Sequence, residues 1–288
     1  MKLRQCYQSI AATLLFFLIL SSCTSNPFGD DDISGGNRKI SGKVQLSNNL
    51  NPEGVFVWLE GLNIGTKTDA QGTFQLILPP PSSQSSGGIS GVFNIYFYMD
   101  NFDIVTKPVA VGGGLFVYSQ GELNNSGEFF NAIFLFQSLS IETVMMPNIV
   151  AGDTGSVISA WVTLQAMKDT VTVFYPRTVT TAERDFLAPL LFRNVITNEV
   201  FIIEFVLAGL GFSDFIDVTV APITRQYVTG LSPGLLPVGK YEVIPYLFTA
   251  HDNLPNALLK TIGQNVEELG ADYLKIPFIR EGGQFEVK

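Results

Sequence analysis

The chain has 288 residues, of which 46% are hydrophobic, and a formal charge of −9 at pH 7. This acidity argues against nucleic acid and anionic lipid headgroups as partners, because like charges repel. With only two cysteines present, the fold must depend on apolar cores, to which 23 phenylalanines contribute.

The first 22 residues have the pattern of a secretory signal peptide. Lys2 and Arg4 make a positive start, an apolar run covers residues 10–20, and two serines precede Cys23. The run is too short to span a bilayer, which takes about 20 apolar residues. Because both cations leave with this segment, the formal charge of −9 becomes −11 in the remainder.

The ending Leu20-Ser21-Ser22-Cys23 resembles the lipobox of bacterial lipoproteins. That resemblance implies diacylglyceryl transfer to the Cys23 sulfur, cleavage before Cys23 and acylation of the new amino terminus. Two or more acyl chains hold a protein firmly on a membrane. Thr24, where an Asp would favour inner-membrane retention, implies release to the outer membrane. With Cys6 removed and Cys23 acylated, no disulfide is available. The alternative is an ordinary secretory signal with a chance cysteine.

Residues 23–38 are expected to form a flexible linker, because their composition cannot bury a core. We interpret Asp30, Asp31 and Asp32 as part of a solvated, charged tether. One alternative is a calcium loop, although no Glu closes a 12-residue EF-hand loop here. Another is an acidic surface-export tag, similar to one that follows the lipid cysteine in some Bacteroidetes lipoproteins.

Strand patterns begin after the linker. Residues 40–46 alternate apolar with polar or small side chains, the period of a strand with one buried face. A second alternation covers residues 55–60, and a third covers residues 74–78. Between the last two, Asp69 is expected to cap a turn with its own side chain, and Gly72 to close the hairpin at positive φ.

The order of these signals resembles the carboxypeptidase regulatory-like domain. The resemblance is carried by Gly42, by the Gly54-Val55-x-Val57 segment and by the Thr68-Asp69-x-x-Gly72-x-Phe74 segment. It implies a transthyretin-like β-sandwich, which we assign to residues 39–147. It does not imply a peptidase, because a zinc carboxypeptidase site needs two histidines and the chain has only His251.

Four aromatic residues are candidates for ligand binding. Phe56 and Trp58 alternate with the apolar face of their strand, and Tyr96 and Tyr98 do so on theirs. If the strands are neighbours, the four rings share an outer face on which a sugar or a protein can stack. The alternative is that the 80–91 loop or the second domain covers them.

Residues 148–288 are predicted to form a second, Ig-like β-sandwich after a boundary loop at 152–155, because short strand patterns recur at regular spacing. Thr180 with Glu183 predicts a short capped helix. Strands are also expected over 254–262, 273–280 and 285–287. The last two flank Gly282-Gly283 as a hairpin turn.

Apparent catalytic motifs do not form a consistent site. Residues 230–234 match the G-x-S-x-G nucleophile elbow around Ser232, yet the following Pro233 has no N–H for an oxyanion hole, so a turn is expected. We interpret Gly209-Leu210-Gly211 as a loop between strands. His251 is expected to lie in a loop at the end of a strand.

These patterns together predict an all-β protein of two β-sandwich domains, with no catalytic residues, no metal and no cofactor beyond the lipid on Cys23. The expected function is that of a non-catalytic, lipid-anchored module of the cell envelope, located at the outer membrane. Its expected partners are the membrane, through the anchor, and envelope proteins or glycans, but no nucleic acid. The alternative is a carbohydrate-binding surface lipoprotein that acts beside glycan uptake.

Overall fold

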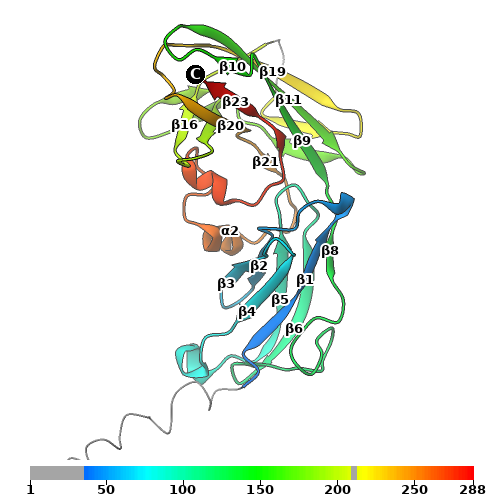
Figure 1. Ribbon diagram of the computed structural model, residues 1–288. Coiled ribbons are helices and arrows are strands. Elements are labelled where there is room, and N and C mark those ends of the chain that lie inside the picture. Colours follow the sequence, from blue (N-terminus) through cyan, green and yellow to red (C-terminus); the bar gives the residue numbers. More distant parts are fainter. Residues whose placement is uncertain (1–35, 209–212) are drawn as a thin grey trace, which may run out of the picture.

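The computed structural model describes residues 36–208 and 213–288, which form two stacked bodies (Figure 1). The predictions for the signal peptide, for Cys23, for most of the linker and for Gly209-Leu210-Gly211 lie outside the described residues. Within the described ranges, no helix is both long and apolar enough to cross a membrane.

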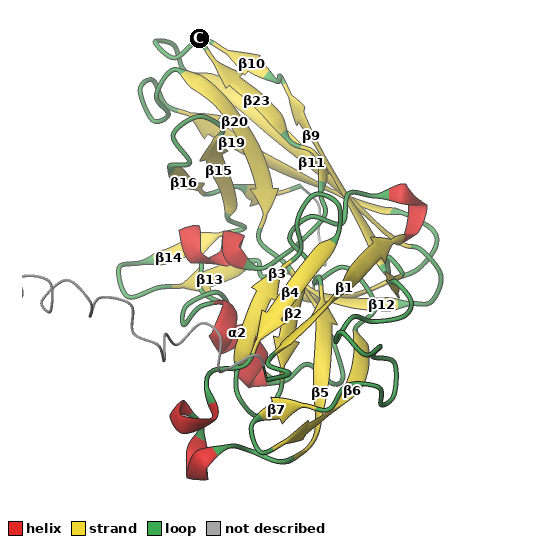
Figure 2. Ribbon diagram, turned by 60° about the horizontal axis from the view of Figure 1, so that its bottom comes forward, coloured by secondary structure: helices red, strands yellow, loops and turns green. Residues whose placement is uncertain are grey.

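The first body is a β-sandwich of two sheets (Figure 2). One sheet has the order β4-β1-β8, in which β1 pairs antiparallel with β4 and parallel with β8. The other has the order β3-β2-β5-β6-β7. The strands are β1 (Lys39–Leu46), β2 (Phe56–Leu59), β3 (Ile64–Lys67), β4 (Thr73–Ile77), β5 (Gly91–Tyr98), β6 (Val105–Gly112), β7 (Leu115–Phe116) and β8 (Ile133–Leu135).

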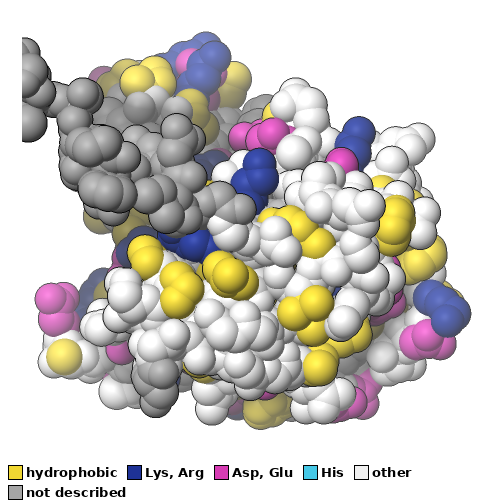
Figure 3. Space-filling view, turned by 90° about the horizontal axis from the view of Figure 1, so that it is seen from below, with side chains coloured by type: hydrophobic (Ala, Val, Ile, Leu, Met, Phe, Trp, Pro, Cys, Tyr) yellow, Lys and Arg dark blue, Asp and Glu magenta, His cyan; other side chains and the backbone are white. Residues whose placement is uncertain are grey.

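The alternating patterns place one face of each sheet in a shared core. Ile40, Val44 and Leu46 of β1 are buried with Val57 and Leu59 of β2. Burial of such a side chain stabilises the fold by about 1.5–3 kcal/mol. On the outer end of this body, hydrophobic side chains lie as separate patches among uncharged residues (Figure 3).

The turn after β3 has the predicted chemistry but connects different strands than expected. The Asp69 carboxylate accepts hydrogen bonds from the backbone N–H groups of Gln71 (3.0 Å) and Thr73 (2.7 Å). Gly72 has φ +78°, and a Cβ there would collide with the carbonyl oxygen of Val44. The turn does not close a hairpin, because β3 pairs with β2 and β4 pairs with β1 in the opposite sheet.

The second body is also built from two main sheets, with orders β17-β19-β11-β9-β22 and β10-β23-β20-β15-β16. Smaller sheets β18-β12-β21 and β13-β14 flank them, and the β13–β14 hairpin projects from the side in Figure 2. The strands are β9 (Leu139–Met146), β10 (Ile149–Val150), β11 (Ser156–Ala166), β12 (Val171–Phe174), β13 (Thr178–Thr180), β14 (Asp185–Leu187), β15 (Leu190–Asn194), β16 (Val200–Ile203), β17 (Val206–Leu207), β18 (Phe215–Val218), β19 (Ile223–Leu231), β20 (Gly239–Pro245), β21 (Phe248–Thr249), β22 (Glu281–Gly282) and β23 (Gln284–Val287).

The protein is therefore nearly all β, as predicted, but the division between the bodies differs from the expected one. Residues 39–147 include β9, yet β9 pairs with β11 over eight residues and belongs to the second body. The chain passes from one body to the other just before Leu139. The boundary-loop prediction at 152–155 was misplaced because glycine-rich turns also occur within a sandwich.

Gly282-Gly283 transfers the chain between sheets and does not close a hairpin. β22 runs parallel to β9, whereas β23 pairs with β20 and β10 in the facing sheet. Both glycines have positive φ, and a Cβ on Gly282 would collide with the carbonyl oxygen of Thr143. Close backbone approach on both sides explains why two glycines stand here.

Three other local predictions were wrong. Most of the predicted strand at 254–262 is instead a helix, α2 (Asn256–Ile262), because Ala257, Leu258, Leu259 and Lys260 favour helix. Thr181 lies in the β13–β14 turn, where its hydroxyl donates to the Arg184 carbonyl oxygen, so no helix follows Thr180. Residues 273–280 begin in a 3₁₀ helix and continue without strand pairing. The 3₁₀ helices are η1 (Ser47–Asn49), η2 (Pro81–Ser83), η3 (Ser85–Gly87) and η4 (Ala271–Lys275).

Candidate functional site at the junction of the two bodies

The four candidate aromatic residues share one face of the β2–β5 pair, but that face is not open. Phe56 lies opposite Tyr98 and Trp58 opposite Tyr96 in the antiparallel register. Phe56, Trp58 and Tyr98 are only 5%, 1% and 0% exposed, and Tyr96 is partly buried against them. This face is therefore an internal contact and not an exposed aromatic platform.

The second body covers this face, which was one of the two alternatives stated for it. The indole of Trp58 donates from Nε1 to the hydroxyl of Thr261 in α2 at 3.0 Å, and Figure 1 places α2 between the bodies. The resulting apolar cluster, here called the junction core, joins Phe56, Trp58 and Tyr98 to residues of the second body. Those residues are Leu191, Ile244, Tyr246, Leu258, Leu259, Val266, Tyr273 and Ile276.

The loop between β5 and β6 fastens the two bodies together through Asp100 and Asn101. Both side chains are buried, and the Asp100 N–H donates to the Pro277 carbonyl oxygen at 2.8 Å. The Asn101 amide donates to the carbonyl oxygens of Leu139 (2.9 Å) and Ile279 (2.8 Å), and its oxygen accepts from the Ile279 N–H. Buried polar groups that are fully bonded in this way specify one relative position of the bodies.

The Asp100 carboxylate lies at the centre of a buried polar network. It accepts hydrogen bonds from the Tyr98 hydroxyl (2.6 Å) and the Thr249 N–H (3.0 Å). His251 Nε2 lies 2.7 Å from the Asp100 carbonyl oxygen and 3.9 Å from its carboxylate. Burial raises the pKa of Asp100, against the opposing effects of His251 and the hydrogen bonds. Burial, followed by the neighbouring Asp100, raises the pKa of Tyr98 well above its usual value.

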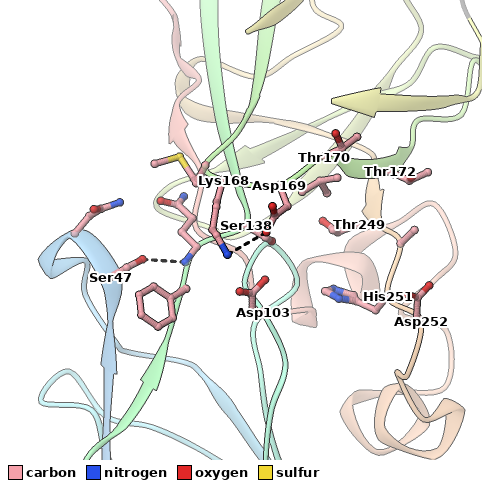
Figure 4. A pocket seen from close by; sticks show the side chains of 16 residues that line it. Ser47, Asp103, Ser138, Lys168, Asp169, Thr170, Thr172, Thr249, His251 and Asp252 are labelled. Carbon is pink, nitrogen blue, oxygen red and sulfur yellow. Dashed lines mark hydrogen bonds and ion pairs between the residues drawn. The ribbon is translucent and has the colours of Figure 1, made fainter. Parts of the chain in front are cut away.

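A cavity of about 680 Å³ opens beside this network and is lined by both bodies (Figure 4). The first body supplies η1, Asp103 and Phe136, and the second supplies the β11–β12 turn and the segment after β21. The complete lining is Ser47, Asn48, Asp103, Phe136, Gln137, Ser138, Met167, Lys168, Asp169, Thr170, Val171, Thr172, Thr249, Ala250, His251 and Asp252.

A second, smaller cavity of about 230 Å³ has Asp100 in its lining and is mostly apolar. It borders Phe248, which belongs to a row of rings across the small β18-β12-β21 sheet. In that row Phe174 lies 4.8 Å from Phe215 and 6.2 Å from Phe248, measured between ring centroids. The wall of this second cavity also includes Tyr98, Tyr246 and Glu267.

The apparent catalytic motif does not contribute to either cavity. Ser232 follows β19 in a turn closed by the Leu235 N–H, as predicted, and lines neither cavity. His251 follows β21 as expected, at the end of a strand. Among the residues that the structure describes, no group of three or more His, Cys, Asp or Glu side chains is arranged to hold a metal ion.

Comparison with known proteins shows no close relative. No family model matches the chain, so the resemblance to the carboxypeptidase regulatory-like domain stays a prediction. No curated protein matches it either.

Among solved structures, a variant of BcpA, the major pilin subunit of Bacillus cereus, is 12% identical, with a TM-score of 0.26 over 72% of this chain and 64% of the pilin. The chain therefore spans less than two thirds of that protein. The Bacillus anthracis TIE protein is 9% identical, with a TM-score of 0.23 over 85% of this chain and 50% of that one.

Sequence reasoning missed Asp100 and Phe136 as site residues. Asp100 is bonded to Thr249 and His251, which lie 149 and 151 residues further along the chain. No local pattern reports a contact of that range. Phe136 carried a weak signal in the sequence, because it ends a short stretch with four phenylalanines, Phe129, Phe130, Phe134 and Phe136.

Proposed function

We propose that this protein is a non-catalytic, lipid-anchored module of the cell envelope that presents a rigid two-sandwich body for binding or for structural support. The observation that carries the proposal is the junction core, together with the Asp100 and Asn101 hydrogen bonds. A large, hydrophobic interface holds two domains as one unit, whereas a small, polar interface allows them to move relative to each other. A rigid body on a lipid anchor and a tether suits a spacer or a receptor better than an enzyme that closes on its substrate.

The anchor is tested by growing cells with a labelled fatty acid. We expect the full chain to incorporate the label and to fractionate with the outer membrane. Cys23→Ser should abolish incorporation, because the thiol is the acylated group. Cys6→Ser is the matched control, since it removes the only other thiol and should leave the label in place. Label retained in Cys23→Ser would show that lipidation is not what holds the protein.

The binding or structural role is tested by chemical crosslinking on intact cells, followed by capture of the chain. Crosslinking to envelope proteins or to glycan at the surface of the two bodies is the expected result. A chain that turns over an envelope substrate in vitro, with turnover lost on mutation of residues around one cavity, would contradict the non-catalytic role.

A further inference from the structure

The cavity of about 680 Å³ between the bodies is within the usual range of ligand pockets, which is about 300–1,000 Å³. Its walls come from segments that lie far apart in the chain and meet only because the junction core fixes the bodies. We infer that this cavity binds a neutral saccharide. The inference rests on the proposed binding role but not on the lipid anchor.

The polar lining offers both donors and acceptors. Asp103 and Asp252 are exposed carboxylates that make no hydrogen bond or ion pair within the described part of the chain. Asn48, Thr170 and Thr172 bring amide and hydroxyl groups to the same cavity. A saccharide hydroxyl both donates and accepts, so this mixture matches it on all sides.

An exposed aromatic ring supplies the apolar part of the site. Phe136 is 60% exposed and lines the cavity, whereas most phenylalanines in the described part of the chain are buried or partly buried. The centroid of its ring lies 4.8 Å from that of Phe134, in an edge contact. The C–H face of a sugar ring packs on such a surface, while its hydroxyls reach the polar wall.

Charge and composition count against other ligand classes. Three carboxylates, on Asp103, Asp169 and Asp252, disfavour an anion, and Lys168 is already paired with Asp169 at 3.2 Å. A simple cation needs only acceptors, which leaves the amides, the hydroxyls and the ring without a role.

The test is calorimetric titration of the folded protein with maltotetraose, cellotetraose and chitotetraose, with spermidine as a cationic probe. We expect at least one tetrasaccharide to bind with a dissociation constant below about 1 mM. Phe136→Ala should weaken that binding roughly 2- to 12-fold through loss of stacking. Asp252→Asn should weaken it about tenfold or more, because hydrogen bonds to charged acceptors are the stronger ones.

Phe130→Ala is the matched control, because Phe130 is equally exposed in the same stretch but does not line the cavity. All three substitutions are at exposed positions, so thermal unfolding curves should stay close to the parent's. Binding of spermidine alone, or saccharide binding that Phe136→Ala and Phe130→Ala affect equally, would overturn the inference. So would no saccharide binding at all, an outcome that leaves the fatty-acid labelling result unaffected.

Discussion

Replacing Trp58 by Ala tests whether the two bodies are held together as the structure shows. The side chain is 1% exposed and its indole N–H donates to Thr261 at 3.0 Å. Truncation of a buried Trp costs about 3–5 kcal/mol, and a lost hydrogen bond adds about 1 kcal/mol. Because Thr261 also donates to the Ala257 carbonyl oxygen and is only partly buried, its released lone pair can accept from water. We therefore expect a loss of about 4 kcal/mol.

This loss of free energy weakens the contact between the two bodies and leaves the core of each separate body unchanged. A domain is typically stable by about 5–15 kcal/mol, so each sandwich should stay folded while the junction opens. Scanning calorimetry should then show one cooperative transition for the parent and two separated transitions for Trp58→Ala. Trp161→Ala is the matched control, because Trp161 is 39% exposed on the outer face of β11.

The fluorescence of Trp58 gives an independent readout. The chain has two tryptophans, so Trp161→Phe leaves Trp58 as the only indole. Its emission should be that of a buried ring and should shift to longer wavelength when the junction opens in urea. The reasoning fails if Trp58→Ala lowers the free energy of unfolding no more than Trp161→Ala does, and if Trp58 in the Trp161→Phe variant emits as an exposed indole. Both results together would mean that this face is open.

Two further predictions concern the backbone and the buried carboxylate. Gly282→Ala should destabilise the protein by more than about 2 kcal/mol in urea unfolding, because its Cβ would meet the Thr143 carbonyl oxygen. Gly234→Ala is the control, because Gly234 is also at positive φ but no described atom lies within 4 Å of a Cβ built there. It should lower the free energy of unfolding by only about 1 kcal/mol, and an equal loss for the two variants would refute the clash at Gly282. Burial raises the pKa of Asp100 above its usual 3.8, so the folded state keeps a proton that the unfolded state loses, and stability falls as pH rises through that range. Asp100→Asn should remove this part of the fall when urea unfolding is measured at a series of pH values above 3.8, whereas parallel curves of stability against pH for both proteins would contradict the shift.

Strand alternation predicted which side chains share a face, but not what covers that face. In β2 the pattern correctly placed Val57 and Leu59 on one side and Phe56 and Trp58 on the other. Both sides are buried, because a strand between two bodies has two cores. Local sequence contains no information on that difference, since an aromatic side chain is equally suited to an interface and to an exposed platform.

Turn chemistry was predictable where its partners are local, and not where they are distant. Asp69 bonds groups two and four residues away, so its cap could be inferred from sequence. Gly282 meets Thr143, which is far away in the chain, and the hairpin predicted there was wrong. The assignment of β9 to the first body was wrong for the same reason, because the partner of β9 is β11 and the local sequence of a strand does not identify its partner.

The candidate site follows from the junction and not from either sandwich. Phe136 precedes the crossing into the second body, whereas Asp252 and His251 come from a segment more than a hundred residues later. The hydrogen bonds of Asp100 hold these segments together, because Asp100 contacts both Thr249 and His251 of the second body. The buried residues that fix the bodies therefore also fix the distance across the cavity. A change in the junction core should alter the cavity even where no lining residue is touched, because preorganised walls depend on the elements that carry them.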